Sequence, residues 1–135
     1  MVFSGNSTYI LNINTLTIEI SSKYIAIVDD ELDIVDLFKE ALEMKGYYVS
    51  AFTNPLLALN HILKDPTRYS LIISDFRMPE MNGDELVTKL LETNIKVILM
   101  SAYHDIECDP NFHFINKPIT IPQLLQIVKD ITSSS

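Results

Sequence analysis

The chain has 135 residues, of which 47% are hydrophobic and 21% are charged, and its formal net charge at pH 7 is −8. These totals are typical of one soluble globular domain that is large enough to bury a core without disulfides or metals. The acidic balance argues against binding to nucleic acid or to an anionic membrane surface, because both kinds of partner attract clustered lysine and arginine side chains.

Residues 1–22 differ from the remainder in composition, because they are rich in serine, threonine and asparagine. Within this segment Leu16, Ile18 and Ile20 alternate with polar residues, a pattern that favours a strand. Asn14-Thr15 offers a turn ahead of that strand. We therefore expect an N-terminal extension with an extra edge strand or a hairpin, although the same residues are also compatible with a loose extension.

The expected compartment is the cytoplasm. The first positively charged side chain is Lys23, and Asn12 and Asn14 interrupt the apolar residues before it, so the N-terminal segment does not resemble a signal peptide. No apolar run approaches the roughly 20 residues of a membrane-spanning helix. The single cysteine, Cys108, excludes an internal disulfide and a cysteine-based metal cluster, and it fits a reducing environment.

From residue 24 onward, short apolar runs alternate with amphipathic patterns of helical period. Buried strands are expected at Tyr24–Val28, 47–52, 71–75, 95–100 and 112–116. Helices are expected at 33–45, 56–64 and 84–92, with a last helix that Thr120 caps and that runs to Ile131 or close to it. Strands and helices in this alternation form βαβ units, which build a parallel sheet with helices on both faces.

Four of these strands end on polar side chains. Asp29 and Asp30 follow the first strand, Asp75 ends the third, Ser101 follows the fourth and Lys117 follows the fifth. Right-handed crossovers bring the carboxyl ends of parallel strands to one edge of the sheet, which is where open α/β sheets bind ligands. We therefore expect these five side chains to form one site.

The residue types at these positions fit phosphoryl chemistry. Three gathered carboxylates repel one another unless a cation or a raised pKa relieves the repulsion, and Mg²⁺ is the natural cation for carboxylate oxygens and a phosphate. The Ser101 hydroxyl and the Lys117 ammonium can bind phosphoryl oxygens. The Asp75 carboxylate can attack phosphorus and form an aspartyl phosphate.

Each of these residues, and Phe114 three positions before Lys117, also has a structural explanation when it is considered alone. Asp29 and Asp30 are suited to the start of a helix, Lys117 to a solvated surface position, and Phe114 to the core. The ordered set of motifs, each at an expected strand end, nevertheless favours a reactive role for Asp75.

The chain resembles a response-regulator receiver domain of two-component signalling. The matching motifs, in chain order, are Asp29-Asp30, Asp75 within DFRMPEMNG, Ser101-Ala102 and Lys117-Pro118. The resemblance implies a flavodoxin-like, doubly wound α/β fold, (βα)₅, with five parallel strands in the order 2-1-3-4-5. The receiver domain is expected at 23–132, after the N-terminal extension at 1–22, and the tail at 133–135 is expected to fray.

The resemblance implies a metal site with Mg²⁺ as the cofactor. Asp30 and Asp75 would bind Mg²⁺ directly, and Asp29 would act partly through water. The backbone carbonyl of Arg77 would be a third ligand group from the protein.

The resemblance also implies a switch that reports on the phosphoryl group. Ser101 would move to bind a phosphoryl oxygen, Lys117 would pair with the same group, and the rotamer of Phe114 would follow the movement of Ser101. The Lys117-Pro118 bond would be cis, which an X-Pro bond permits at modest cost.

Two features depart from the family pattern. The interval between Ser101 and Lys117 is short, and residues 103–111 contain Pro110 and lack a helical apolar face, so we expect a shortened, distorted or missing fourth helix. Arg77 and Tyr103 are bulky at positions that the family uses to tune dephosphorylation, so the lifetime of the phosphate is not predicted.

The predicted function is that of a stand-alone receiver. It would take a phosphoryl group onto Asp75 from a histidine kinase or a phosphotransfer protein and then change its affinity for another protein. It would be a monomer or a weak dimer, would bind neither nucleic acid nor membrane directly, and would not be an enzyme beyond its own phosphorylation and dephosphorylation.

Two alternatives stay open. The first is a degenerate receiver that acts as a constitutive binding module. The second is an aspartyl-phosphate phosphatase, which is disfavoured because Arg77 stands where such enzymes place a second aspartate.

Overall fold

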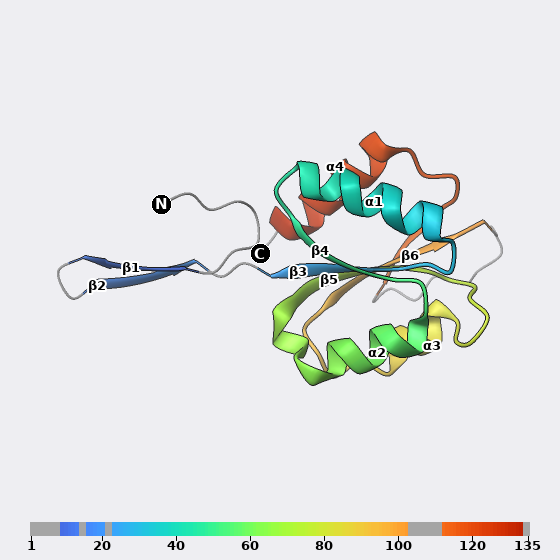
Figure 1. Cartoon of the computed structure of the whole chain (residues 1–135), viewed down its shortest axis with the longest axis horizontal. Coiled ribbons are helices and arrows are strands. Elements are labelled where there is room, and N and C mark those ends of the chain that lie inside the picture. Colours follow the sequence, from blue (N-terminus) through green and yellow to red (C-terminus); the bar gives the residue numbers. More distant parts are fainter. Residues whose placement is uncertain (1–8, 14–15, 21–22, 103–111, 134–135) are drawn as a thin grey trace.

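A parallel sheet of five strands forms the centre of the protein (Figure 1). The computed structural model describes residues 9–13, 16–20, 23–102 and 112–133. Its elements in chain order are β1 (Tyr9–Ile13), β2 (Leu16–Ile20), β3 (Tyr24–Val28), α1 (Leu32–Met44), β4 (Tyr48–Phe52), α2 (Pro55–Lys64), a 3₁₀ turn (Pro66–Arg68), β5 (Tyr69–Asp75), α3 (Gly83–Thr88), β6 (Lys96–Ser101), β7 (His113–Asn116) and α4 (Ile121–Ser133). The strand order is β4-β3-β5-β6-β7, which is 2-1-3-4-5 when the strands are counted from β3. The prediction of a flavodoxin-like, doubly wound fold is confirmed.

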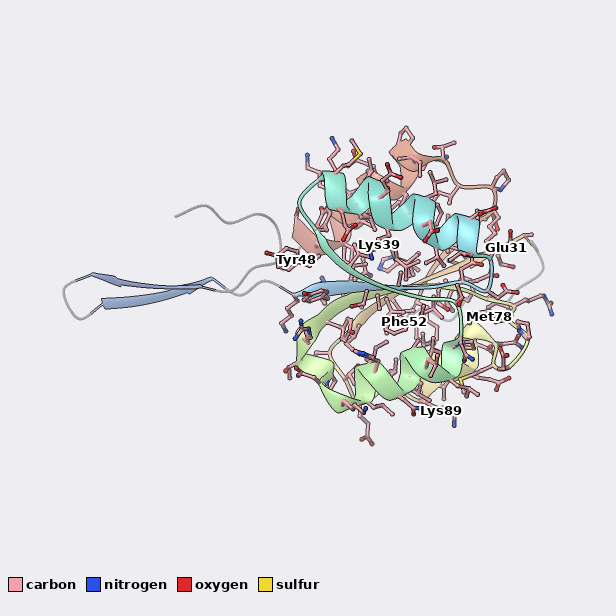
Figure 2. All side chains as sticks on the ribbon, in the orientation of Figure 1. Glu31, Lys39, Tyr48, Phe52, Met78 and Lys89 are labelled. Carbon is pink, nitrogen blue, oxygen red and sulfur yellow. The ribbon has the colours of Figure 1, made fainter. Side chains whose placement is uncertain are left out.

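Helices cover both faces of this sheet, with α1 and α4 on one face and α2 and α3 on the other (Figure 1). Successive residues of a strand point to opposite faces, so β3 sends Ile25 and Ile27 to the α1–α4 core and Ala26 and Val28 to the α2–α3 core. Side chains fill the space between the sheet and both helical layers (Figure 2). This burial on two faces is why the strands read as unbroken apolar runs in the sequence.

Local sequence signals set the helix ends. α1 stops before Gly46, whose φ of 93° lies in the left-handed region that glycine adopts without strain. At the start of α2 the Asn54 side chain accepts a hydrogen bond of 2.8 Å from the Leu56 N–H. α4 begins with a capping box, in which the Thr120 N–H donates to Gln123 Oε1 at 2.9 Å and the Gln123 N–H donates to Thr120 Oγ1 at 3.3 Å.

The third helix is shorter than the predicted 84–92, because α3 spans Gly83–Thr88. Beyond it the chain forms tight turns, in which the Leu90 N–H donates to the Val87 carbonyl at 2.9 Å and the Thr93 N–H donates to the Leu90 carbonyl at 3.0 Å. The Thr93 hydroxyl also donates to the Leu90 carbonyl at 2.6 Å. A threonine that binds nearby backbone in this way competes with helical hydrogen bonding. The predicted end of this helix was therefore wrong.

Two predicted segments lie partly or wholly outside the described residues. β6 ends at Ser101 and β7 begins at His113. The expected change in the fourth helix, and with it Tyr103, falls at 103–111, which the description does not include. α4 runs to Ser133, so the first residue of the expected tail is helical, and 134–135 lie beyond the described part.

The N-terminal segment forms a hairpin of its own. β1 and β2 pair in antiparallel fashion, with Tyr9 opposite Ile20 and Ile13 opposite Leu16. They make a two-stranded sheet that is separate from the other five strands. In Figure 1 this hairpin projects away from the body of the protein, near the start of β3. Across the described ranges, no helix has the length and apolar character needed to cross a membrane.

Candidate functional site

Four polar positions meet at the carboxyl edge of the sheet, as expected from the strand ends. Asp29 directly follows β3, Asp75 is the last residue of β5, Ser101 is the last residue of β6, and Lys117 directly follows β7. The parallel register keeps these ends level, because Ser74 lies beside Val28 on one side and Asp75 lies beside Met100 on the other.

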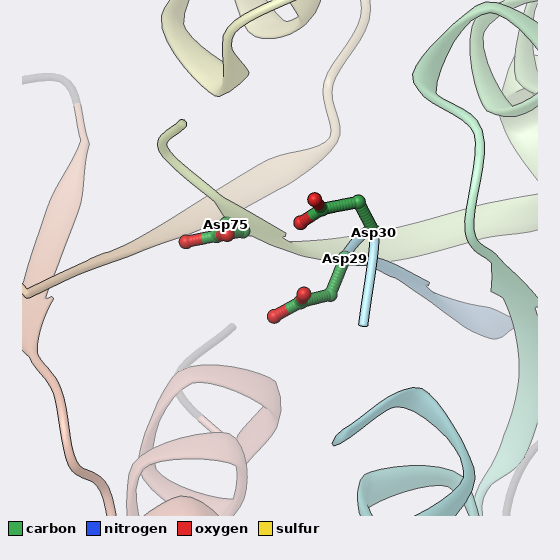
Figure 3. A group of neighbouring side chains, drawn as sticks. All are labelled: Asp29, Asp30 and Asp75. Carbon is green, nitrogen blue, oxygen red and sulfur yellow. The ribbon is translucent and has the colours of Figure 1, made fainter. Parts of the chain in front are cut away.

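Three carboxylates gather at this edge, and Figure 3 shows those of Asp29, Asp30 and Asp75 close together. An oxygen from each lies within 4.8 Å of an oxygen from each of the others. Asp29 is fully buried, Asp75 is 8% exposed, and Asp30 is exposed to solvent. Backbone donors orient the two buried groups: the Glu31 N–H donates to Asp29 Oδ1 at 2.9 Å, and the Phe76 N–H donates to Asp75 Oδ1 at 3.0 Å. This donor set suits a hard divalent cation.

Lys117 connects two of these carboxylates. Its Nζ lies 3.0 Å from Asp75 Oδ1 and 3.3 Å from Asp29 Oδ2. The backbone helps to place it, because the Lys117 N–H donates to the carbonyl of Ser101 at 2.7 Å. The Lys117-Pro118 peptide bond is cis, as predicted. The carboxylate of Asp75 therefore forms an ion pair with Lys117 and also belongs to the group of three carboxylates.

The surroundings raise the pKa of both partners in this ion pair. Burial raises the pKa of Asp75, and the negative charges of Asp29 and Asp30 add to the rise, while the hydrogen bond and charge of Lys117 oppose it without cancelling it. Burial lowers the pKa of Lys117, but its hydrogen bonds and charge interactions with Asp75 and Asp29 outweigh that effect and raise it overall. The lysine stays charged, and Asp75 favours a proton or a cation.

The turn after Asp75 packs tightly against the backbone of that residue. A Cβ atom added to Gly83 would overlap the backbone carbonyl oxygen of Asp75 and would lie 2.9 Å from Leu99 Cδ2. The same turn is held by the Gly83 N–H, which donates to the Phe76 carbonyl at 2.7 Å, and by the Phe76 N–H, which donates to the Met100 carbonyl at 2.8 Å. The sequence pattern indicated the turn but not the positioning role of Gly83, since only the fold shows which atoms a side chain would meet.

The remaining predicted residues lie around this turn. Ser101 is 3% exposed. Phe114 is half-buried, and its ring centroid lies 6.1 Å from that of Phe76, the residue after Asp75. Arg77 is exposed, and its guanidinium carbon lies 5.8 Å from the centre of the Phe76 ring. The role of the Arg77 carbonyl as a metal ligand stays a prediction. The sequence had not indicated the contact between Phe76 and Phe114.

The family model described as "Response regulator receiver domain" matches residues 25–129 of this chain.

Individual proteins of known function are also similar. Sporulation initiation phosphotransferase F of Bacillus subtilis is 33% identical over 114 residues, which cover 78% of this chain and 90% of that protein. The C4-dicarboxylate transport transcriptional regulatory protein DctD of Rhizobium meliloti is 32% identical over 108 residues, which cover 74% of this chain but only 23% of that protein.

Solved structures are similar as well. The crystal structure of a two component transcriptional regulator AraC from Clostridium phytofermentans superimposes with a TM-score of 0.72 and is 29% identical in sequence. The superposition covers 83% of this chain and 93% of the other.

Proposed function

Because the chain belongs to the response regulator receiver domain family, we propose that Asp75 accepts a phosphoryl group from a histidine kinase or a phosphotransfer protein. The observation that carries this proposal is the position of Lys117 Nζ, 3.0 Å from Asp75 and 3.3 Å from Asp29, beside a group of three carboxylates. Negative charge concentrates on the phosphoryl oxygens during the transfer. The Lys117 ammonium and a cation held by the three carboxylates would both stabilise that charge beside Asp75.

The proposed cofactor is Mg²⁺. The donor set fits this ion, because oxygens of Asp29, Asp30 and Asp75 approach one another within 4.8 Å and Mg²⁺ prefers oxygen ligands. Asp30 and Asp75 are the proposed direct ligands, with Asp29 acting partly through water and the Arg77 carbonyl as a further ligand. When bound, the ion would neutralise carboxylate and phosphoryl charge during transfer.

The chain's own residues have distinct roles in the proposed transfer. A bond forms between a carboxylate oxygen of Asp75 and phosphorus, and the phosphorus–nitrogen bond of the donor phosphohistidine breaks, so that the bonding electron pair leaves with the imidazole nitrogen. Only ionised Asp75 can attack, and the Lys117 ammonium favours that form. Lys117 then pairs with the phosphoryl oxygens, and the Ser101 hydroxyl donates to one of them.

The proposed output is a change in affinity for another protein, with no reaction on any further substrate. The phosphoryl group would bias two states of the chain through Ser101 and Phe114. The contact of the Phe114 ring with Phe76, next to the acceptor, supports this route. The Bacillus subtilis relative, which the match covers over 90% of its length, is named a phosphotransferase, and this supports a role in phosphoryl transfer. A cytoplasmic location is part of the proposal, and the single cysteine supports it.

Phosphorylation of the full chain by acetyl phosphate and Mg²⁺, followed by intact-protein mass spectrometry, tests the acceptor. The wild-type chain should gain one phosphoryl group, and Asp75→Asn should gain none. Asp33→Asn is the matched control, because Asp33 is an exposed carboxylate in the first turn of α1, and it should label at about the wild-type rate. Replacing Mg²⁺ with EDTA should slow labelling by about tenfold or more. Labelling of Asp75→Asn at the wild-type rate would show that another residue is the acceptor.

A further inference from the structure

The outward side of α2 is rich in leucine and contains no acidic residue. Six residues of this helix are exposed, and we call them the α2 face: Leu56, Leu57, Asn60, His61, Leu63 and Lys64. The three leucines are 43%, 62% and 49% exposed, in chain order. A single exposed leucine is ordinary on a protein surface, whereas several on one helix face form the kind of apolar patch that marks an interaction site.

Among the helices that the structure describes, only α2 combines exposed leucines with a lack of acidic residues. α3 carries Asp84 and Glu85 in its first turn, and α4 exposes no large apolar side chain. α1 does expose large apolar side chains, but four exposed acidic residues lie among them, Asp33, Asp36, Glu40 and Glu43. The α2 face therefore differs in chemistry from the rest of the helical surface.

The charge near α2 is opposite in sign to that of the whole chain. Residues 44–64 contain two lysines and none of the 18 acidic residues. Lys64 is exposed and forms no ion pair with any described residue, and the same is true of Lys89 at the end of α3, which packs beside α2. The nearest acidic residue after the helix is Asp65, whose carboxylate accepts a hydrogen bond of 3.0 Å from the Thr67 hydroxyl. Two lysines are thus available to an anionic group beside the leucines.

We propose that the α2 face binds an amphipathic helix of a partner protein, apolar along one side and acidic along its borders. Between its ends α2 has no free backbone groups, so a partner cannot add to it as a strand and must satisfy its own backbone, as a helix does. The leucines of the α2 face would pack between apolar side chains of that helix. Glutamate or aspartate at its borders would pair with Lys64 and Lys89.

Electrostatics directs an acidic helix to this face. The chain carries a net charge of −8, so most of its surface repels an acidic segment and attracts a basic one. Near α2 the lysines reverse that preference. An acidic helix therefore has one favourable place to bind among the helical faces described, whereas a basic helix is drawn to acidic residues elsewhere, such as those on α1.

The size of the α2 face indicates a weak complex. α2 has ten residues, so it is about 15 Å long and offers a partner helix roughly three turns. Contacts of this extent belong to the small, transient class of interface, below about 1,200 Å². We therefore expect a Kd weaker than about 1 μM.

Fluorescence anisotropy with a labelled peptide tests the proposal. The probe is an 18-residue helical peptide of leucine and alanine with glutamate along both borders of its leucine stripe, and a second peptide has lysine in place of every glutamate. Leu63→Ser should weaken binding of the acidic peptide to the full chain by about tenfold, because half of a leucine side chain is lost from the contact. Leu37→Ser is the matched control, since Leu37 on α1 is also 49% exposed, and it should change binding by less than about twofold.

A charge exchange tests the electrostatic part. Lys64→Glu should weaken binding of the acidic peptide by about tenfold and strengthen binding of the lysine peptide at α2. Lys129→Glu makes the same change at an exposed position of α4 and should alter binding of the acidic peptide by less than about twofold. Amide chemical-shift changes caused by the acidic peptide in the wild-type chain should centre on α2. These substitutions are at exposed positions, and circular dichroism should show wild-type helix content for each variant.

Several results would overturn the proposal: no binding of the acidic peptide, equal weakening by the two serine variants, or chemical-shift changes centred away from α2. Self-association of the chain that Leu63→Ser abolishes would instead assign the face to a second copy, and vesicle binding with the same dependence would assign it to lipid. The inference does not depend on phosphorylation. Asp75→Asn should bind the acidic peptide as the wild-type chain does, and acetyl phosphate labelling of Leu63→Ser reports separately on the proposed function.

Discussion

Asp75 is a carboxylate whose charged form the surrounding protein disfavours. Burial raises its pKa above the ordinary value of 3.8, and Asp29 and Asp30 raise it further, so the folded protein holds the Asp75 proton more tightly than the unfolded chain does. The stabilisation from that proton is complete below pH 3.8 and is lost as the pH rises through the folded pKa. Without a bound cation, ionised Asp75 therefore destabilises the fold at neutral pH.

Asp75→Asn should raise the melting temperature in EDTA at neutral pH by a few degrees, because the amide has no charge to bury. The asparagine oxygen can still accept the hydrogen bond from the Phe76 N–H. Thermal unfolding followed by circular dichroism at about pH 7 and at about pH 4 measures the effect, which should shrink at the lower pH as wild-type Asp75 takes up its proton. Asp33→Asn is the control, and a lower melting temperature for Asp75→Asn at neutral pH would contradict the argument.

At the scale of elements, the start of α3 sets the position of the end of β5, where Asp75 lies. Gly83 is the first residue of α3, and its missing side chain lets the helix approach the carbonyl of Asp75 and the side chain of Leu99. The Ser74 hydroxyl donates to the same Asp75 carbonyl at 2.9 Å. A side chain at position 83 would push α3 away from β5 and would displace the carboxylate of Asp75.

Gly83→Ala should destabilise the protein by about 1–3 kcal/mol, because the backbone must shift to admit a methyl group. It should also slow phosphorylation by acetyl phosphate by about tenfold or more, since small displacements of reacting groups are costly. Gly46→Ala is the control: it strains a glycine at a φ of 93° but lies at the end of α1, away from the site. It should lower stability and leave the labelling rate unchanged. Equal labelling rates for the two variants would refute the positioning role of Gly83.

The edge strand β7 contacts the turn after Asp75 through the Phe114 ring. Phe114 packs with Phe76 and belongs to the side chains around Val87 and Leu99. The ring therefore connects the residue after Asp75 to the strand that precedes Lys117. Such a contact can carry a response only if the phosphoryl group changes its equilibrium.

Phe114→Ala should retain binding of beryllofluoride and Mg²⁺ at Asp75 but reduce the resulting amide chemical-shift changes in β7 and α4 by roughly half or more. Phe112→Ala is the matched control, because Phe112 packs in the same cluster and is absent from the ring contact with Phe76. Nuclear magnetic resonance titration measures both variants. A wild-type response in Phe114→Ala would remove this ring from the proposed switch.

At the scale of the whole molecule, a cation bound at the acidic edge would stabilise the folded state, because the unfolded chain does not gather the three carboxylates. Mg²⁺ should raise the melting temperature in a concentration-dependent way, with a gain of about 2.7 kcal/mol at a free concentration one hundred times Kd. The gain should fall as the pH drops through the raised pKa of Asp75, because protons then compete with the ion. Thermal unfolding across a Mg²⁺ series measures it. Asp30→Asn removes one exposed carboxylate of the group and should lose most of the stabilisation by Mg²⁺. If Mg²⁺ stabilises this variant as much as the wild-type chain, the ion binds elsewhere.

Much of the fold was predictable because parallel strands that are buried on both faces appear as continuous apolar runs. The run at Tyr24–Val28 is the strand β3 itself, and Gly46 and Asn54 mark helix ends by their own conformational preferences. The end of α3 was not predictable in the same way. There, Thr93 competes for backbone carbonyls, and nothing in the apolar pattern signals that competition.

The sequence by itself determined which residue types stand at the strand ends, since a strand's apolar run and the polar residue that follows it are both local features. The tertiary structure decided which of those side chains touch. Lys117 reaches Asp29 across 88 positions of sequence because β7, β6, β5 and β3 stand in that order in one sheet. The same holds for Gly83 against Asp75 and for Phe114 against Phe76. Contacts between distant segments depend on strand order, register and close packing, and a local pattern contains none of these.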